Sequence, residues 1–276
     1  VIITGGIDLS VGSMLALIGG LSVDVFNASN SALLTLLFAL AMGVALGLFN
    51  GLLIGKVKMP AFIVTLATML IYRSVAQYYL RATGGASRRS IFKMDSTLSA
   101  YGGFFGFGNN TLLTVPAVSL VLIGVMLIIV FITTSTKFGK TVYAVGSNER
   151  AAQLAGINVA WTRVLVYVIT GALCGMATFL WLAMNGSVDP ATLGQSNEMY
   201  AIAAVVIGGI SMSGGKGKLL GVLFGAMSYT TIDKILAALK MDALINNTIK
   251  GAILLVAVLV QLVIPMLRGK LKKVSA

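Results

Sequence analysis

The sequence predicts an all-α integral membrane protein: a polytopic helix bundle with two parallel structural repeats and broken helices. Hydrophobic residues make up 58% of the 276 residues and charged residues only 10%. Such a chain has too little polar surface to cover a soluble globule. Several apolar windows also exceed the roughly 20 residues that a membrane-spanning helix needs, and the alternation typical of an outer-membrane barrel is absent.

The predicted membrane helices are separated by short polar segments. A polar patch at 27–31 ends the first helix, Lys56–Pro60 marks a turn after the second, and Pro116 suits the first turn of the fourth. The polar, glycine-rich and aromatic stretch 81–115 is expected to be a long loop that can include a short interfacial helix. The expected helices are Leu9–Phe26, Ala32–Gly55, Ala61–Leu80, Pro116–Thr136, Val164–Met184, Met199–Met212, Lys218–Leu239 and Thr248–Ile264.

A glycine-rich motif occurs twice, as GGIDLSVGS at 5–13 and as GGISMSGG at 208–215. Each copy follows an apolar run and precedes a long apolar helix. Paired glycines at matching places in two halves indicate interrupted membrane helices, which are tolerated where protein or a water-filled cavity surrounds the backbone. A turn at the membrane surface, with Asp8 or Ser10 capping the next helix, is the alternative. The expected helix breaks are Gly5, Gly6, Gly208 and Gly209.

Small residues at a spacing of four predict close helix packing. Gly43, Gly47, Gly51 and Gly55 share one helical face, and the same spacing recurs at Gly171 and Gly175 and at Gly217, Gly221 and Gly225.

Polar side chains inside the apolar segments are expected to face the bundle. Asn50 should point inward, either for a hydrogen bond between helices or for a substrate contact. Arg73 and Gln77 share a helical face, and Arg73 should meet a partner or a wet cavity unless its side chain snorkels to the surface.

The hydrophilic connection 137–163 contains the signals of a short helix. Ser147 or Asn148 caps it, Glu149 lies in its first turn, and Gly156 ends it. The alanines at 151, 152 and 155 form a low-relief surface suited to a groove of another protein. A connector lying on the membrane is the alternative.

The positive charges predict an orientation. If the basic tail at 268–273 is cytoplasmic, alternation places most Lys and Arg residues on that side, including those of 137–163, although the basic residues of 81–93 run against it. The helices after the two glycine breaks then both run outward, so the repeats are parallel, related by an axis along the membrane normal.

Several function classes are excluded by what the sequence lacks. Its net charge of +12 is distributed over segment ends and does not form one basic face, which argues against nucleic acid. With no histidine and a lone Cys174, neither a catalytic site nor a metal site can be assembled. The segment SGGKGK at 213–218 lacks the glycine and the hydroxyl of a phosphate-binding loop. We therefore expect no enzyme and no cofactor, and a nucleotide that drives transport must be bound by another chain.

Four stretches together resemble the permeases of bacterial ABC sugar importers of the ribose, galactose and xylose type. They are GGIDLSVGS, MPAFIVTLATMLIYR at 59–73, YAVGSNERAAQLAGINV at 143–159 and AIAAVVIGGISMSGGKGKLLG at 201–221. The resemblance covers nearly the whole chain and implies a single permease domain over 1–276 in the bacterial inner membrane, with one to two further helices before Val1. Arg150 replaces a small residue of the family pattern, and Tyr200 stands beside Glu198 where such permeases commonly carry an acid.

The resemblance implies alternating access driven by a partner ABC ATPase that binds the ATP. The other partners are an extracytoplasmic sugar-binding protein, a second permease copy, the lipid bilayer and a monosaccharide substrate such as galactose or ribose. The cytoplasmic loop 137–163 would couple to the ATPase through Asn148, Glu149, Ala151, Ala152, Ala155 and Gly156. Since a sugar needs hydrogen-bonding groups, the candidates for the translocation path are Asp8, Ser10, Asn50, Gln77 and Ser211.

Two other functions remain open from the sequence. One is an ABC permease for branched-chain amino acids or for the furanosyl signal autoinducer-2. The other is an ion-coupled secondary transporter, for which Asp8 and Asp233 are the only plausible protonatable groups.

Overall fold

The computed structural model describes residues 1–83, 91–112, 114–240, 245, 248–260 and 263. Its main helices are α1 (Val11–Ser29), α2 (Ala32–Gly55), α3 (Ala61–Thr83), α4 (Ser99–Asn109), α5 (Ala117–Ser135), α6 (Lys137–Ser147), α7 (Glu149–Leu154), α8 (Val159–Asn185), α9 (Asn197–Ile207) and α10 (Leu219–Ala238). A 3-10 helix, η1 (Ile2–Thr4), precedes α1, and an apolar helix covers Thr248–Val260. The strands are β1 (Phe92–Lys93), β2 (Thr111–Leu112), β3 (Val115–Pro116) and β4 (Ser187–Val188).

The all-α, multi-pass class predicted from composition is confirmed. Among the described residues six helices are long and apolar enough to cross a membrane, namely α1, α2, α3, α5, α8 and α10. Many of their large apolar side chains are exposed, including Leu33, Phe62, Leu70, Leu122 and Phe131, as suits surfaces in contact with lipid. In the described ranges the strands form two antiparallel pairs, β1 with β4 and β2 with β3.

Helix α2 has the predicted bounds because both of its ends carry local signals. Ser31 caps it by accepting a hydrogen bond from Leu34 N at 3.3 Å, and the chain turns after Gly55. Elsewhere the bounds differ. Helix α8 begins already at Val159, where Asn158 accepts from Trp161 N at 3.1 Å, and α9 ends at Ile207, before the predicted Met212. The predicted end of the last helix at Ile264, like the basic tail, lies outside the described residues.

The structure adds a helix, α6, within the connection from 137 to 163. Thr136 caps it by accepting from Gly139 N at 3.2 Å, and Val142 and Val145 are buried on its inner face. One apolar stripe on an otherwise polar segment is enough for a helix when neighbours cover it.

The predicted glycine face of α2 packs directly on α8. A Cβ atom at Gly43 would overlap the carbonyl oxygen of Gly171, and a Cβ atom at Gly47 would overlap that of Tyr167. Gly175 in turn lies against the carbonyl oxygen of Ala39. We call this contact the α2–α8 seam. Because only hydrogen fits at these positions, the two backbones touch over most of the length of α2.

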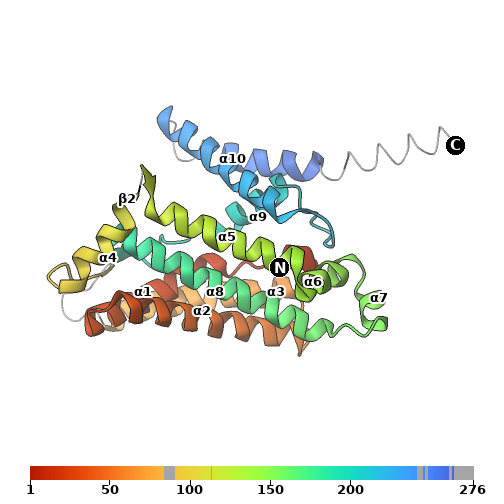
Figure 1. Cartoon of the computed structure of the whole chain (residues 1–276), viewed down its shortest axis with the longest axis horizontal. Coiled ribbons are helices and arrows are strands. Elements are labelled where there is room, and N and C mark those ends of the chain that lie inside the picture. Colours follow the sequence, from red (N-terminus) through yellow and green to blue (C-terminus); the bar gives the residue numbers. More distant parts are fainter. Residues whose placement is uncertain (84–90, 113, 241–244, 246–247, 261–262, 264–276) are drawn as a thin grey trace.

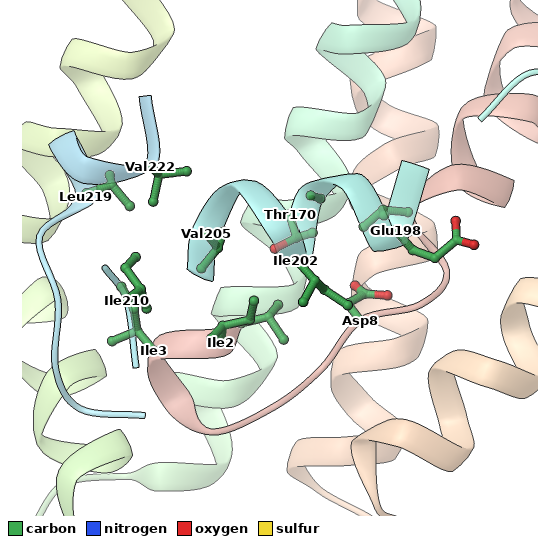
Figure 2. A pocket seen from close by; sticks show the side chains of 13 residues that line it. Ile2, Ile3, Asp8, Thr170, Glu198, Ile202, Val205, Ile210, Leu219 and Val222 are labelled. Carbon is green, nitrogen blue, oxygen red and sulfur yellow. The ribbon is translucent and has the colours of Figure 1, made fainter. Parts of the chain in front are cut away.

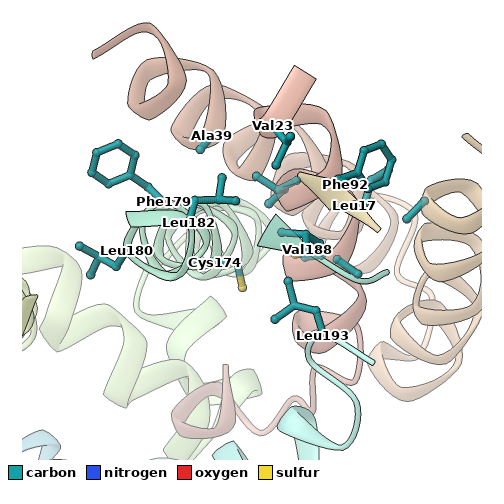
Figure 3. Close-up of a cluster of buried hydrophobic side chains, with 14 of the residues drawn as sticks. Leu17, Val23, Ala39, Phe92, Cys174, Phe179, Leu180, Leu182, Val188 and Leu193 are labelled. Atoms are coloured by element: carbon teal, nitrogen blue, oxygen red, sulfur yellow. The ribbon is translucent and has the colours of Figure 1, made fainter. Parts of the chain in front are cut away.

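The apolar core lies beside this seam (Figure 3). Leu17 and Val23 of α1, Phe92 of β1 and Val188 of β4 pack there with Leu182 and Phe179 of α8. The lone Cys174 is buried in the same cluster.

The two ends of the bundle carry different elements (Figure 1). Helix α4 lies at one end and α7 at the other, while α9 and α10 lie along the upper side of the view. The turn after α2 is at the α7 end, where Lys56 Nζ sits 4.3 Å from the centre of the Trp161 ring. The basic residues of the 56–60 turn and of 137–163 therefore share one side, as the charge pattern predicts.

Replacing Gly43 with alanine should destabilise the bundle by about 1–3 kcal/mol, because the added methyl group meets backbone that cannot give way. Gly124→Ala in α5 is the matched control, since a Cβ atom there has nothing within 4 Å and alanine favours a helix. Thermal unfolding of the purified variants in detergent measures the difference. Equal melting temperatures for the two variants would contradict the backbone contact in the seam.

Candidate functional site

Both predicted helix breaks are visible as interruptions of helical backbone. The first follows η1, where Gly5 adopts the left-handed conformation with φ 77°, and α1 starts only at Val11. The second follows α9, where Gly209 has φ +82° and α10 starts at Leu219. Such backbone inside an apolar bundle needs partners for its polar groups.

The two breaks meet each other, and α6 packs on both. Gly215 N donates to the carbonyl oxygen of Ile3 at 2.8 Å, which joins the second break to the first. A Cβ atom at Gly146 of α6 would overlap that same carbonyl oxygen. Tyr143, also on α6, donates from its hydroxyl to the carbonyl oxygen of Gly217 at 2.9 Å. We call this meeting point the break junction.

A cavity of about 220 Å³ lies beside the break junction (Figure 2). We call it the central cavity. Its wall is mostly apolar and comes from both breaks, from α9 and from α8. The residues that line it include Ile2, Ile3, Asp8, Thr170, Glu198, Ile202, Val205 and Ile210.

Asp8 belongs to a buried chain of hydrogen bonds behind the cavity wall. Its Oδ1 accepts from Ser10 N at 2.9 Å and from Ser10 Oγ at 2.6 Å. Asn50 Nδ2 donates to Ser10 Oγ at 2.9 Å, and the Tyr72 hydroxyl donates to Asn50 Oδ1 at 3.2 Å. The Oδ2 atom of Asp8 is buried and has no hydrogen-bond partner within the described part of the chain. One carboxylate oxygen is therefore fixed while the other is left to accept.

Arg73 finds partners inside the protein. Its Nη1 donates to the carbonyl oxygens of Pro190 at 2.9 Å and of Leu193 at 2.5 Å. The side chain thus fixes the loop before α9, and the alternative of snorkelling to the membrane surface is not what the structure shows. This loop also touches α1, because a Cβ atom at Gly12 would overlap the carbonyl oxygen of Gly194 and approach Glu198 Oε2.

The predicted path residues occupy different places. Asp8 lines the central cavity, and Ser10 and Asn50 lie behind it in the buried chain of hydrogen bonds. Gln77 is half-buried on α3. Ser211 belongs to a turn after the second break, where its Oγ accepts from Ser213 N at 3.3 Å.

Sequence reasoning did not select Glu198 and Thr170, which line the cavity with Asp8. A signal for Glu198 was present, because it is an acid in the first turn of an apolar helix. No sequence signal distinguishes Thr170 from the other threonines in apolar helices.

The predicted short helix in 137–163 is α7. Asn148 caps it by accepting from Ala151 N at 3.0 Å. Glu149 forms a two-pronged ion pair with Arg163, with N–O distances of 2.7 and 3.2 Å, and this partner was not anticipated. Gly156 ends the helix region in the left-handed conformation with φ +80°.

The prediction that Ala151, Ala152 and Ala155 share one exposed surface of α7 is partly wrong. Ala152 is only 4% exposed and packs on Val145 and Val159. Ala151 and Ala155 are exposed, and Leu154 is 87% exposed beside them. Residue spacing alone did not reveal which face of so short a helix rests on its neighbours.

A multi-pass helix bundle in which two helix interruptions meet beside a cavity is typical of membrane transport proteins. The chain belongs to the family described as the permease component of the branched-chain amino acid transport system, which matches residues 1–258. It is a multi-pass protein of the inner membrane.

Curated relatives match over most of the chain. The ribose import permease protein of Escherichia coli (strain K12) is 37% identical over 94% of this chain and 78% of its own length. The fructose import permease protein of Rhizobium meliloti is 34% identical over 94% and 71%. The autoinducer 2 import system permease protein of Enterobacter sp. (strain 638) is 36% identical over 92% and 71%. No solved structure matches this chain.

Replacing Asn50 with leucine should lower stability by about 1–3 kcal/mol, since it removes the amide that bridges Ser10 and Tyr72 and leaves the Tyr72 hydroxyl only the longer contact with Leu46 O at 3.4 Å. Ser228→Ala, at an exposed position of α10, is the control for loss of a polar side chain. Chemical or thermal unfolding in detergent would reveal the difference. An Asn50→Leu variant as stable as Ser228→Ala would show that this chain of hydrogen bonds contributes nothing to the fold.

Proposed function

We propose that this chain is the membrane-spanning permease subunit of an ATP-driven importer for a monosaccharide such as ribose or galactose, received from an extracytoplasmic binding protein. The observation that carries the proposal is the break junction, because one helix, α6, contacts both interrupted helices and leads directly into α7. The relatives are named as import permeases for ribose, fructose and autoinducer-2, and these names support a sugar-like substrate.

Helix α7 is suited to receive motion from an ATPase on the cytoplasmic side. Its outer face offers Ala151, Leu154 and Ala155, and the Glu149–Arg163 ion pair ties its first turn to α8. A shift of α7 would tilt α6. Because Gly146 and Tyr143 contact the two breaks, the tilt would move both walls of the central cavity together. Asn148 and Gly156, which begin and end the helix, would keep α7 a rigid unit.

ATP would be bound by a partner ABC ATPase. The lookalike loop at 213–218 is engaged within the break junction, where Gly215 N donates to Ile3 O. A phosphate could not use that amide without breaking the contact. We therefore propose a subunit without its own ATPase site. In the assembled transporter it would work with a second permease copy.

Asp8 is the best-supported path residue. Its Oδ2, which is buried and has no hydrogen-bond partner among the described residues, would accept from a hydroxyl-rich solute that enters the mostly apolar cavity. Ser10 would act through Asp8 by holding its Oδ1, and Asn50 would act one step further away by holding Ser10 Oγ. Gln77, a half-buried polar residue of α3, and Ser211, in the turn after the second break, are further proposed path residues.

The alternatives have weaker support. A branched-chain amino acid carries a cation and an anion, but Arg73 is engaged by two carbonyl oxygens and the charged residues of the central cavity wall are the acids Asp8 and Glu198. An ion-coupled carrier would use Asp8 and Asp233, yet Asp233 forms an ion pair with Lys250. Autoinducer-2 shares the hydroxyl-rich chemistry of a sugar, so only transport assays separate the two.

The proposal is tested by reconstituting the chain with its ATPase and binding protein in vesicles. ATP on the ATPase side should drive uptake of a labelled monosaccharide, and an uncoupler should not stop it. Uptake that needs an ion gradient but no ATP would overturn the proposal in favour of a secondary transporter. Uptake of leucine in place of sugar would assign the chain to amino acid import.

Replacing Ala151 and Ala155 with tryptophan should reduce sugar-dependent ATPase activity and uptake at least tenfold, because bulk on the exposed face of α7 prevents its seating in a groove. Ala28→Trp, exposed at the opposite end of the bundle, is the matched control. Melting temperatures close to that of the parent should accompany both changes. Normal coupling in the double variant would remove the role proposed for α7.

A further inference from the structure

A second cavity, of about 350 Å³, lies where α8 ends, and this end of α8 is the one away from α7 (Figure 1). We call it the outer cavity. It is formed by the end of α8, by β4 and by the loop that leads into α9. Its polar wall comes from Trp181, Asn185, Asp189, Thr192, Gln195 and Asn197. Small-molecule pockets have volumes of roughly 300–1,000 Å³, so it has room for one small ligand.

Hydrogen bonds within the loop and from Arg73 hold the wall of the outer cavity in place. Trp181 Nε1 donates to the carbonyl oxygen of Ser187 at 3.2 Å. Both Asp189 oxygens are engaged in the loop, Oδ1 by Ala191 N and Oδ2 by Thr192 Oγ1, each at 2.8 Å. Arg73 holds the same loop by two of its carbonyl oxygens.

The loop divides its side chains between two environments. Val188 packs in the apolar core, and Leu193 packs there while it also borders the outer cavity (Figure 3). The neighbouring polar side chains line the cavity. The site is therefore preorganised, and a ligand would not have to order it.

The chemistry of the wall fits a neutral, hydroxyl-rich ring. Trp181 is 43% exposed and can offer an aromatic surface to the C–H face of a sugar. The side-chain amides of Gln195 and Asn197 form no hydrogen bond with the described part of the chain. Each side-chain amide has an NH2 group that donates hydrogen bonds and a carbonyl oxygen that accepts them. The central cavity, in contrast, is mostly apolar.

The outer cavity adjoins the central cavity through the first turn of α9. Asn197 lines the outer cavity and Glu198 lines the central one. The backbone contact of Gly194 with Gly12 lies beside this turn. The first turn of α9 and this contact therefore stand between the two cavities.

We propose that the outer cavity is a loading site that binds one monosaccharide, with Trp181 as a stacking surface and Gln195 and Asn197 as hydroxyl-binding groups, before the sugar enters the central cavity. This inference rests on the proposed function for its substrate class and for its position on the extracytoplasmic side. It assigns specificity-determining residues to the permease itself.

Tryptophan fluorescence tests the proposal, because the chain has only two tryptophans. Trp161→Phe leaves Trp181 as the emitter, and Trp181→Phe leaves Trp161 at the opposite end beside Lys56. Titration of the purified variants with ribose, galactose and fructose should change the emission of Trp161→Phe saturably with at least one sugar. The emission of Trp181→Phe should not change, and leucine should affect neither variant.

A second variant keeps the test valid if Trp181→Phe misfolds. Gln195→Ala with Asn197→Ala, made in the Trp161→Phe background, should weaken the fluorescence-detected affinity about tenfold, as expected for the loss of two hydrogen-bonding groups. In reconstituted vesicles the same pair should raise the KM for sugar uptake more than it lowers the maximal rate.

The outcomes separate this inference from the proposed function. No saturable change in Trp161→Phe with any of the sugars, or equal affinity after removal of the two amides, overturns the loading site. If ATP-driven sugar uptake persists in either case, the proposed function stands. If vesicles import no monosaccharide, the proposed function fails, and a fluorescence change caused by leucine would overturn the substrate class of the site as well.

Discussion

The hydrogen bond from Gly215 N to the Ile3 carbonyl oxygen joins two interrupted helices that are far apart in the sequence. Backbone that leaves a helix inside a membrane protein must find other partners, and here each break supplies one for the other. Their meeting leaves the central cavity beside them and leaves room for α6 only because Gly146 has no side chain. The cavity, the breaks and α6 thus depend on one close backbone contact.

The sequence predicted features whose causes lie within a few neighbouring residues. Ser31 and the glycines of α2 determine the bounds and the packing face of that helix, and both follow from local patterns. Asn148, Glu149 and Gly156 determine α7 in the same way, through a cap, an acid in the first turn and a left-handed stop. The class of protein followed from composition, because few polar residues cannot cover a soluble fold.

Features that depend on distant residues could not be predicted. Helix α6 requires Ile3 and Ile210 to cover its apolar stripe. The residues near position 140 do not indicate that these two distant side chains pack there. Ala152 faces inward because Val159 lies beneath it, not because of its spacing from Ala151. Arg73 was expected to meet a partner, but the carbonyl oxygens of Pro190 and Leu193 come from another part of the chain. The outer cavity is likewise built from the end of one helix and the start of the next.

The α2–α8 seam constrains how the protein can change shape. Where backbones touch there are no rotamers to exchange, so the two helices move as one rigid body. Helices α9 and α10 form a second such body, because Gly221 and Gly225 lie against the backbone of Gly208 and Ala204. Two stiff blocks that meet at the break junction deform by hinge motion rather than by internal rearrangement. The pivot then falls at the paired glycine interruptions, where the blocks adjoin and the solute would pass.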